Sequence, residues 1–294
     1  MSQSGQPLLV SREAHPGVRG TLVIEIGGRG LAARVRIGDG SPVLIAGPCA
    51  VESREQTLAI ARAAQAVGAQ LLRGGAWKPR TSPYSFQGLG SRGLEILAEA
   101  RAETGLPIVT EALDPRHVEE VGRVADVVQI GARSMQNFPL LREVGRLGKP
   151  VLLKRGLAAT LEEWILAAEY IAVEGNLQIL FCERGVRTVA SGEVPQGNKP
   201  RQHLDLEMIP ALRARTPFPI LVDPSHAMAR HDLVVPAAKA ALAFGVDGLM
   251  VEVMGEHSDR KSLLSDAEQA IRPSELAEIA AACAADPHVL GSPS

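Results

Sequence analysis

The feature that most constrains the fold of this chain is a regular alternation of short apolar runs with longer helical segments, from residue 43 to residue 271. The runs are rich in Val, Ile and Leu, and each leads into a polar or charged side chain. Strands that alternate with helices form parallel sheets through right-handed crossovers. Eight such units in about 230 residues fit a closed barrel. The sequence therefore predicts an α/β fold, specifically a (β/α)8 TIM barrel.

The eight predicted strands are short and evenly spaced. They cover residues 43–46, 70–73, 107–110, 127–130, 151–154, 177–182, 220–222 and 248–252. Helices are expected between them, and two have clear boundaries. Ser53 followed by Gln56 is a capping-box pattern that opens a helix over residues 54–67, with Gly68 as its stop, and a second helix over residues 160–173 ends before Gly175.

The N-terminal part lacks this alternation. Residues 1–20 have no periodicity and are expected to form a loose terminus. Residues 21–26 and 32–37 flank a Gly-rich turn and predict a short β-hairpin that covers the closed end of the barrel. The expected organisation is a flexible N-terminus with this hairpin (1–40), one catalytic barrel (41–285) and a C-terminal tail (286–294).

Composition excludes several classes of partner. Of the 294 residues, 46% are hydrophobic and 22% charged, and the net charge of -2 gives no electrostatic reason to bind nucleic acid or an anionic membrane. No run of 18 apolar residues and no export signal is visible. The three cysteines are an odd number without CxxC spacing, which is typical of a reducing compartment. We therefore expect a cytoplasmic protein.

Four side chains after the first, seventh and eighth strands are candidate metal ligands. In such barrels, the carboxyl ends of the strands converge on one pocket. Cys49, His226, Glu252 and Asp266 supply a thiolate, an imidazole and two carboxylates, a set that suits Mn²⁺, Fe²⁺, Co²⁺ or Zn²⁺ better than Mg²⁺. Taken singly, a strand cysteine is usually packing and a histidine after Asp-Pro-Ser could simply cap a helix. Their joint placement favours the metal interpretation.

Basic side chains also gather at or just beyond the strand ends. They are Arg73, Lys78, Arg80, Arg133, Lys154, Arg155, Arg184 and Arg187. Positive charge that faces inward carries a desolvation cost unless an anion pairs with it, so the pattern predicts a small polyanionic substrate. Gly74, Gly75 and Gly131 flank these residues, and glycine lets backbone N–H groups approach a phosphate. The alternative is that these are solvated charges on the rim.

Six motifs resemble one family throughout the barrel. They are GPCAVES (47–53), RGGAWKPRTSPYSFQG (73–88), QIGARSMQNF (129–138), LLKRG (152–156), CERGVRT (182–188) and DPSHA (223–227). These motifs resemble the type I 3-deoxy-D-arabino-heptulosonate 7-phosphate (DAHP) synthases, in the branch related to 3-deoxy-octulosonate 8-phosphate synthase. The KPRTS segment resembles the DAHP side of that branch.

The resemblance implies a transferase that forms a carbon–carbon bond. It would condense phosphoenolpyruvate with erythrose 4-phosphate and release phosphate, the first step of the shikimate pathway towards aromatic amino acids. One alternative keeps this chemistry with another aldose phosphate, such as arabinose 5-phosphate. A second alternative is a non-catalytic barrel that acts as a regulatory or scaffold subunit, but this predicts damaged ligand positions and all four are intact.

The resemblance also implies roles for individual residues. Arg73, Lys78 and Lys154 match the group that holds the phosphoenolpyruvate carboxylate, and Arg133, Lys154 and Arg184 match the clamp for its phosphate. Arg80, Thr81 and Ser82 match the site for the aldose phosphate, and Glu111 is a further candidate substrate contact. Lys78, Cys49 and His226 are the candidate catalytic residues; either Lys78 or a water at the metal would move the proton.

Some stretches depart from the family pattern. Residues 189–203 are longer and richer in Gly and Pro than expected, which leaves the aldose open. Met254 and Gly255 follow Glu252, so Asp259 and His257 are rival metal ligands, although Asp266 follows Leu-Leu-Ser as the motif does. The N-terminal part is too short for the regulatory domain of some relatives, so feedback control would need a partner or be absent. Relatives are commonly dimers or tetramers, and we expect a homo-oligomer.

The two other cysteines receive a structural interpretation. Cys182 is expected to pack as a small apolar side chain. Cys283 lies in an Ala-rich segment and is expected to be inert.

Overall fold

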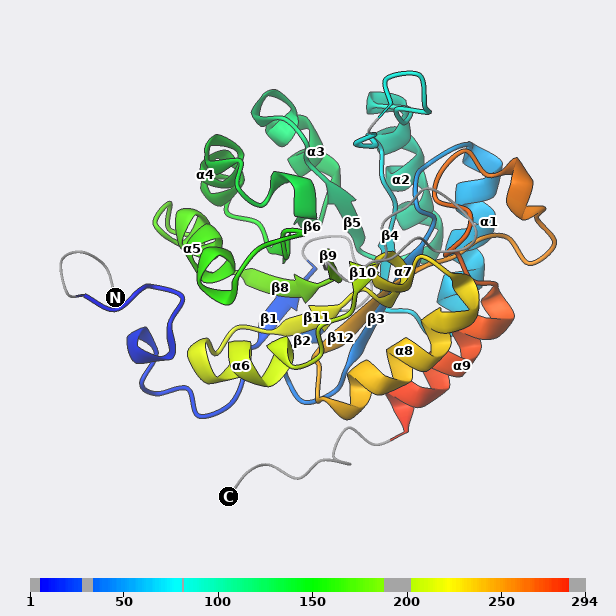
Figure 1. The fold of residues 1–294 in the computed structure, drawn as a ribbon. Helices are drawn as coiled ribbons and strands as arrows, with labels where there is room; N and C mark the ends of the chain where they lie inside the picture. Colours follow the sequence, from blue (N-terminus) through cyan, green and yellow to red (C-terminus); the bar gives the residue numbers. More distant parts are fainter. Residues whose placement is uncertain (1–5, 28–33, 81, 188–201, 286–294) are drawn as a thin grey trace.

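A closed barrel of eight parallel strands forms the centre of the computed structural model, which describes residues 6–27, 34–80, 82–187 and 202–285 (Figure 1). Around the barrel the order is β11-β12-β3-β4-β5-β6-β7-β8. The strands are β3 (Val43–Gly47), β4 (Leu71–Arg73), β5 (Ile108–Glu111), β6 (Val127–Ile130), β7 (Val151–Lys154), β8 (Ile179–Glu183), β11 (Ile220–Val222) and β12 (Gly248–Glu252). Each lies within two residues of its predicted range, so the predicted fold class is confirmed.

Helices connect the strands and surround the barrel (Figure 1). They are α1 (Arg54–Ala66), α2 (Ser91–Thr104), α3 (Val118–Val124), α4 (Phe138–Arg146), α5 (Leu161–Ala172), α6 (Met208–Arg215), α7 (Pro224–Met228), α8 (His231–Ala243) and α9 (Pro273–Ala284). Short 3-10 turns are η1 (Arg12–Ala14), η2 (Pro115–His117), η3 (Ala132–Ser134) and η4 (Arg260–Ser262). Within the described ranges, no helix has the length and apolar character needed to cross a membrane.

The two helix starts chosen from the sequence are both capped, but in different ways. At α5, Thr160 and Glu163 form a complete capping box. At α1, the Ser53 hydroxyl accepts the backbone N–H of Gln56 at 3.1 Å, as predicted. The Gln56 side chain, however, donates to Glu52 at 3.2 Å instead of returning to the cap. The second half of the predicted capping box is therefore wrong, and the Gln56 side chain instead stabilises the loop that follows β3.

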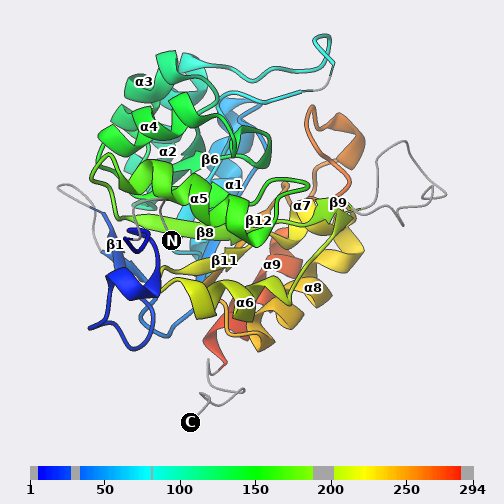
Figure 2. The same cartoon turned by 60° about the vertical axis from the view of Figure 1, so that its left-hand side comes forward.

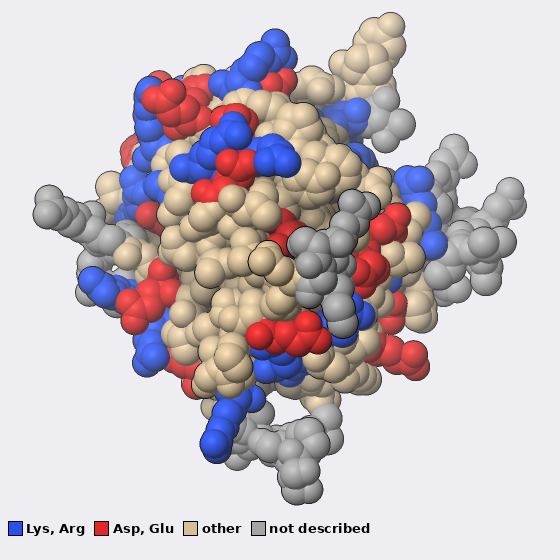
Figure 3. All heavy atoms as spheres, turned by 90° about the vertical axis from the view of Figure 1, so that its left-hand side faces the viewer, with Lys and Arg blue, Asp and Glu red and all other residues tan. Residues whose placement is uncertain are grey.

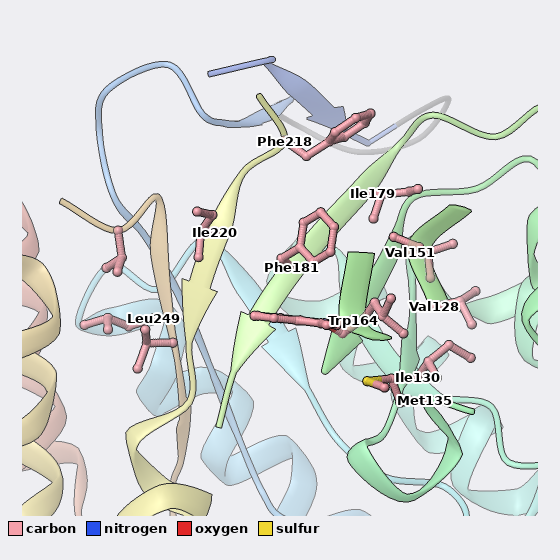
Figure 4. Close-up of a cluster of buried hydrophobic side chains, with 14 of the residues drawn as sticks. Val128, Ile130, Met135, Val151, Trp164, Ile179, Phe181, Phe218, Ile220 and Leu249 are labelled. Atoms are coloured by element: carbon pink, nitrogen blue, oxygen red, sulfur yellow. The ribbon is translucent and has the colours of Figure 1, made fainter. Parts of the chain in front are cut away.

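The strands alternate between two apolar layers, as a side-chain period of two requires. In β3, Val43 and Ile45 join a cluster inside the barrel, whereas Leu44 packs towards the helices. Figure 4 shows part of the outer layer, where Trp164 of α5 meets Phe181 of β8 edge to face with ring centroids 5.1 Å apart. These two layers fix which side chains of each strand point inward.

A hairpin closes one end of the barrel. Strand β1 (Ile24–Ile26) pairs antiparallel with β2 (Val35–Ile37). Ile24, Ile26 and Ile37 are buried in the same cluster as the inward side chains of all eight barrel strands. Figure 2 shows β1 at one end of the barrel and α7 and β9 at the other. The hairpin therefore seals the amino-terminal end with apolar side chains.

The carboxyl end is different, because there the inward position becomes polar. Side chains two residues apart on a strand point to the same side. The residue two positions after the last inward apolar side chain of each strand therefore also points inward, and it is a glycine or a polar residue. These positions are Gly47, Arg73, Glu111, Gln129, Lys154, Arg184, Asp223 and Glu252. A second hairpin, β9 (Val186–Arg187) with β10 (Gln202–His203), lies beside this end.

Candidate active site

A cavity of about 530 Å³ opens at the carboxyl end of the barrel. Among the described residues that line it, cations outnumber carboxylates seven to two, since the only Asp or Glu side chains in this lining are Glu111 and Asp266. The seven cations are Arg73, Lys78, Arg80, Arg133, Lys154, Arg184 and Arg187. Such an excess of positive charge fits a ligand that carries several negative charges.

Charges on the outer surface are arranged otherwise. On the face in Figure 3, basic and acidic side chains lie next to one another. Pairs of this kind include Arg142 with Glu174 at 2.7 Å and Arg123 with Glu119 at 2.7 Å. The cavity is thus a place where positive charge gathers beyond what neighbouring acids balance.

The four candidate metal ligands meet at the edge of this cavity. Cys49, His226, Glu252 and Asp266 each present one ligand atom, and these atoms lie within 4.8 Å of one another. The His226 Nε2 lies 3.2 Å from the Glu252 Oε1, and the Cys49 Sγ lies 3.2 Å from the Asp266 Oδ2. One cation with bonds of about 2.0–2.3 Å can bridge atoms at such spacings. The donor set and its spacing therefore fit a divalent transition metal.

The rival ligands lie elsewhere. Asp259 and His257 are both exposed, and the Asp259 carboxylate accepts the N–H of Lys261 at the start of η4. Asp266 instead has a left-handed backbone with φ of 35°, which is uncommon for a residue other than glycine. Strain of this kind often occurs at functional sites. The geometry therefore favours Asp266 as the fourth ligand.

Protonation states follow from burial and from neighbouring charges. Burial raises the pKa of the Cys49 thiol well above its ordinary value, and Glu252 adds to the effect while Lys78 opposes it. Burial would also raise the pKa of Glu252, but His226 and Arg73 bring it down to about 2. Burial lowers the pKa of His226. The imidazole and the carboxylate are thus already in the forms that bind metal, whereas the thiol must lose its proton.

Lys78 and Arg73 lie against the metal-ligand cluster. The Lys78 Nζ is 2.6 Å from the Cys49 Sγ and 3.1 Å from the Asp266 carboxylate. Arg73 is buried and donates to Glu252 at 2.8 Å and to the Cys49 carbonyl at 3.2 Å, and its Nε has no hydrogen-bond partner among the described residues. Both cations balance the negative charge of the ligand atoms. Their predicted contact with a substrate carboxylate stays a prediction.

Two glycines allow the close contacts at this end. A Cβ on Gly47, which has φ of 157°, would lie 2.0 Å from the Arg73 carbonyl oxygen, so only glycine fits at the turn before Cys49. A Cβ on Gly131 would lie 2.1 Å from the Glu111 Oε1. Glu111 also accepts from Gln129 at 2.9 Å. Gly131 was expected to give access to phosphate; here it makes room for the Glu111 carboxylate at the cavity wall.

The other predicted substrate residues are distributed around the cavity. Lys154 and Arg184 are buried in its wall, whereas Arg133 is exposed at its rim. Arg80 lies 3.9 Å from Asp266, and Ser82 lines the rim. Thr81 lies outside the described residues, as do residues 189–201 of the long segment that left the aldose open. Of the three predicted phosphate cations, Lys154 and Arg184 are thus the buried ones.

Arg155 was expected to face an anion in the pocket, and this prediction is wrong. Its guanidinium donates to Glu183 at 3.0 Å and to Asp205 at 2.9 Å, and it does not line the cavity. The reason is parity: Lys154 follows Leu152 of the inner cluster by two residues, so Arg155 must point outward. Arg155 therefore stabilises the layer behind the cavity.

Several site residues were missed from the sequence. Asp223 accepts from His226 and Lys154, Gln269 donates to Glu252 at 2.7 Å, and Gln202 accepts from Arg184. Counting two residues on from the inward Leu221 would have identified Asp223. Gln269 lies on a connecting segment and Gln202 on the two-residue strand β10, and neither stretch is long enough or regular enough to indicate a side-chain direction.

The remaining cysteines are placed as expected. Cys182 is fully buried in the cluster inside the barrel, among apolar side chains. Burial raises its pKa to about 12, so it is a neutral packing group. Cys283 lies near the end of α9 and is partly buried against the core.

Comparison with known proteins agrees with this geometry. The model of the DAHP synthetase I family matches residues 20–289. A phospho-2-dehydro-3-deoxyheptonate aldolase of Thermotoga maritima is 48% identical over 263 residues, which cover 90% of this chain and 72% of the relative. A 2-dehydro-3-deoxyphosphooctonate aldolase of Syntrophotalea carbinolica is 34% identical over 80% of this chain and 87% of the relative.

Solved structures give the same result. The crystal structure of the Thermotoga maritima DAHP synthase superposes with a TM-score of 0.82 and 46% identity, covering 93% of this chain and 74% of that one. A truncated form of the Thermotoga maritima synthase covers 93% of both chains, with a TM-score of 0.79 and 42% identity. The predicted resemblance is confirmed, and the chain belongs to the DAHP synthetase I family.

Proposed function

We propose that this chain is a divalent-metal-dependent 3-deoxy-7-phosphoheptulonate synthase that condenses phosphoenolpyruvate with erythrose 4-phosphate. The observation that carries the proposal is a cluster of Cys49, His226, Glu252 and Asp266 at the edge of a cavity lined by seven cations. Both substrates are small phosphorylated anions. The greater identity to the heptulonate relative than to the octulonate relative, 48% against 34%, favours the four-carbon aldose.

The cations would hold the substrates in a reactive geometry. Lys154 and Arg184, buried in the cavity wall, would bind the phosphoenolpyruvate anion together with Arg133 at the rim. Arg80 and Ser82 lie further out and would meet the phosphate of the aldose. Fixing both reactants in this way replaces a bimolecular encounter by one that is effectively unimolecular, which lowers the barrier.

The reaction would form one carbon–carbon bond and break one carbon–oxygen bond. The methylene carbon of phosphoenolpyruvate attacks the aldehyde carbon, and water then captures the positive centre that develops at C2. Loss of inorganic phosphate by cleavage of the C2–O bond leaves the ketone of the product. The oxygen of the water becomes the ketone oxygen, so the water loses both protons: one is taken up by the aldehyde oxygen and the other leaves with the phosphate as hydrogen phosphate.

The metal would be held by Cys49, His226, Glu252 and Asp266. When bound, it would supply Lewis-acid polarisation of the aldehyde. We propose Mn²⁺, Fe²⁺, Co²⁺ or Zn²⁺, because the thiolate and imidazole are softer ligands than Mg²⁺ prefers. Lys78, whose Nζ lies against the Cys49 Sγ and the Asp266 carboxylate, is the side chain placed to hold or move a proton there.

Two broader features are also proposed. The resemblance suggests association into a homo-oligomer, a dimer or a tetramer, and the cysteine usage suggests a cytoplasmic location. Size-exclusion chromatography with light scattering would test the first.

The proposed function is tested by turnover of the purified chain with Mn²⁺, phosphoenolpyruvate and erythrose 4-phosphate. We expect release of phosphate together with a seven-carbon ulosonate phosphate identified by mass. Arabinose 5-phosphate and ribose 5-phosphate at the same concentration serve as competing aldoses. If arabinose 5-phosphate were the only aldose turned over, the chain would catalyse the octulosonate reaction instead. No turnover with any aldose would reject the proposal.

A further inference from the structure

Asp223 is a buried acid between the metal-ligand cluster and the substrate cations. It stands at the inward position beyond Leu221 of β11 and has no exposed surface. Its Oδ1 accepts the backbone N–H of His226 at 2.9 Å and so caps α7. Its Oδ2 lies 2.7 Å from the His226 Nδ1 and accepts from the Lys154 Nζ at 2.5 Å. One carboxylate therefore contacts a metal ligand and a substrate cation.

The contact with His226 sets the direction of the imidazole. The Asp223 Oδ2 that lies 2.7 Å from the His226 Nδ1 also accepts from the Lys154 ammonium, so it is a hydrogen-bond acceptor towards both groups. An ionised carboxylate only accepts hydrogen bonds, so the proton of the neutral ring lies on Nδ1 when a metal takes Nε2. Nε2 is the atom that faces Glu252, at 3.2 Å. The carboxylate thus orients the ring and increases its strength as a ligand.

The contact with Lys154 has the opposite consequence for an anion. Lys154 is buried in the cavity wall, and its ammonium is already balanced by Asp223. An anion that reaches Lys154 must share it with this carboxylate and is also repelled by it. The same negative charge that helps a cation bind at His226 therefore weakens the binding of an anion at Lys154.

We propose that Asp223 is a positioning residue that couples the metal site to the substrate-anion site, raising affinity for the cation and lowering affinity for the anion in the absence of the cation. The identity of the anion as phosphoenolpyruvate rests on the proposed function, whereas the metal part does not. With a cation on the Nε2, the His226 Nδ1–H would be a stronger donor to Asp223, and the carboxylate would compete less for Lys154. This would favour an order in which the metal is in place before the substrate binds.

The test is Asp223→Asn in the full chain after removal of metal by a chelator. Direct titration with Mn²⁺ alone should show affinity reduced about 10- to 100-fold, as for other partners of metal-bound histidines. Titration with phosphoenolpyruvate alone, followed by intrinsic tryptophan fluorescence because Trp77 lies in the cavity wall, should show increased affinity. If the Asp223 charge acts on both sites, its removal should change the Mn²⁺ affinity and the phosphoenolpyruvate affinity in opposite directions. Unchanged Mn²⁺ affinity, or a phosphoenolpyruvate affinity that does not rise, would overturn the proposal.

Two further variants keep the result interpretable. Asp223→Ser retains a side-chain cap for α7 but cannot bridge His226 and Lys154, so it should repeat the split between the two affinities even if Asp223→Asn folds poorly. Asp247→Asn is the matched control. Asp247 is also a buried acid, accepts from Arg213 at 2.9 Å and from the Ile220 N–H at 2.8 Å, but lies at the start of β12 at the opposite end of the barrel. It should lower thermal stability and leave both affinities within about twofold.

The outcome is separable from that for the proposed function. The Mn²⁺ titration requires neither aldose nor turnover. Absence of synthase activity together with the expected loss of Mn²⁺ affinity would reject the function and keep the role of Asp223 at the metal. Full synthase activity of the native chain with unchanged Mn²⁺ affinity in both Asp223 variants would do the reverse.

Discussion

The two ends of the barrel follow the same side-chain period and reach opposite outcomes. At the amino-terminal end, the inward side chains are apolar and pack against Ile24, Ile26 and Ile37 of the hairpin. At the carboxyl end, the next inward positions are charged or polar except for Gly47, and five of the eight line a cavity. A change of residue type at one position per strand, with no change of backbone, is thus enough to turn a packed core into a candidate active site.

The difference separates stability from chemistry along each strand. Apolar burial contributes roughly 1.5–3 kcal/mol for each large side chain removed from water. The charged groups at the other end lost hydration free energy on burial, and their ion pairs must offset this cost; examples are Arg73 with Glu252 and Lys154 with Asp223. Substitutions at the closed end should therefore affect stability alone, and substitutions at the open end should affect binding and turnover.

The largest effect is expected for Cys49→Ala at the open end. Loss of the thiolate removes one of the four clustered ligands, so the variant should lose metal and at least about 100-fold of its turnover while keeping its fold. Metal content by atomic emission, turnover and circular dichroism would be measured together. Chelator treatment of the native chain should cause the same loss, restored by added Mn²⁺.

Cys182→Ala is the matched control inside the barrel. It removes the same sulfur atom from the apolar cluster, so it should cost roughly 1 kcal/mol of unfolding free energy and leave metal content unchanged. Activity that survives in metal-depleted Cys49→Ala, or metal that is lost in Cys182→Ala, would contradict the division between the two ends.

A second test uses two neighbours of opposite parity. Lys154→Met removes a cation from the cavity wall and should weaken phosphoenolpyruvate binding about 100-fold. Arg155→Met should leave Glu183 and Asp205 without their cation, lower the free energy of unfolding by about 3–5 kcal/mol and leave phosphoenolpyruvate binding by the folded protein unchanged. Denaturant unfolding and substrate titration of both variants would check this. Equal effects of the two changes on binding would refute the parity argument.

The closed end is tested by Ile26→Ala. This side chain has no exposed surface, and its truncation should lower unfolding free energy by about 2–5 kcal/mol. Below the unfolding transition, kcat and KM should stay within about twofold of the native values, because no described residue of β1 or β2 lines the cavity. A large change in KM would mean that the hairpin is part of the site.

The smallest effect is expected for Gly131→Ala. The added Cβ would force the Glu111 carboxylate away, and we expect a KM increase of about tenfold or less with little change in stability. Gly148→Ala is the control, since it also places a Cβ on glycine, at φ of 67°, but with no atom within 4 Å. It should cost about 1 kcal/mol of stability without any kinetic change.

Much of the fold could be predicted because it depends on local periodicity. The eight strands and the Ser53 and Thr160 caps each follow from a few adjacent residues. The candidate ligands Cys49, His226 and Glu252 could be selected because parallel strands deliver their ends to one place. The same rule applied with strict parity would also have included Asp223 and excluded Arg155.

The rest depends on contacts that no local pattern encodes. Asp266 lies on a loop and itself has the left-handed backbone conformation that brings it to the cluster. The neighbouring Ser265 is fixed by two hydrogen bonds to Glu52, more than two hundred positions earlier in the chain. Gln269 and Gln202 likewise lie outside the barrel strands. Such positions are set by the assembled structure, so the sequence offered only the candidate residue types.

The most direct test of the central claim is anomalous diffraction from crystals of the native chain grown with Mn²⁺ and phosphoenolpyruvate. The account predicts one strong Mn²⁺ peak bonded to the Cys49 Sγ, the His226 Nε2 and the carboxylates of Glu252 and Asp266, with the substrate anion on Lys154 and Arg184. A peak away from these four groups, or a substrate bound outside the cavity at the carboxyl end, would contradict it.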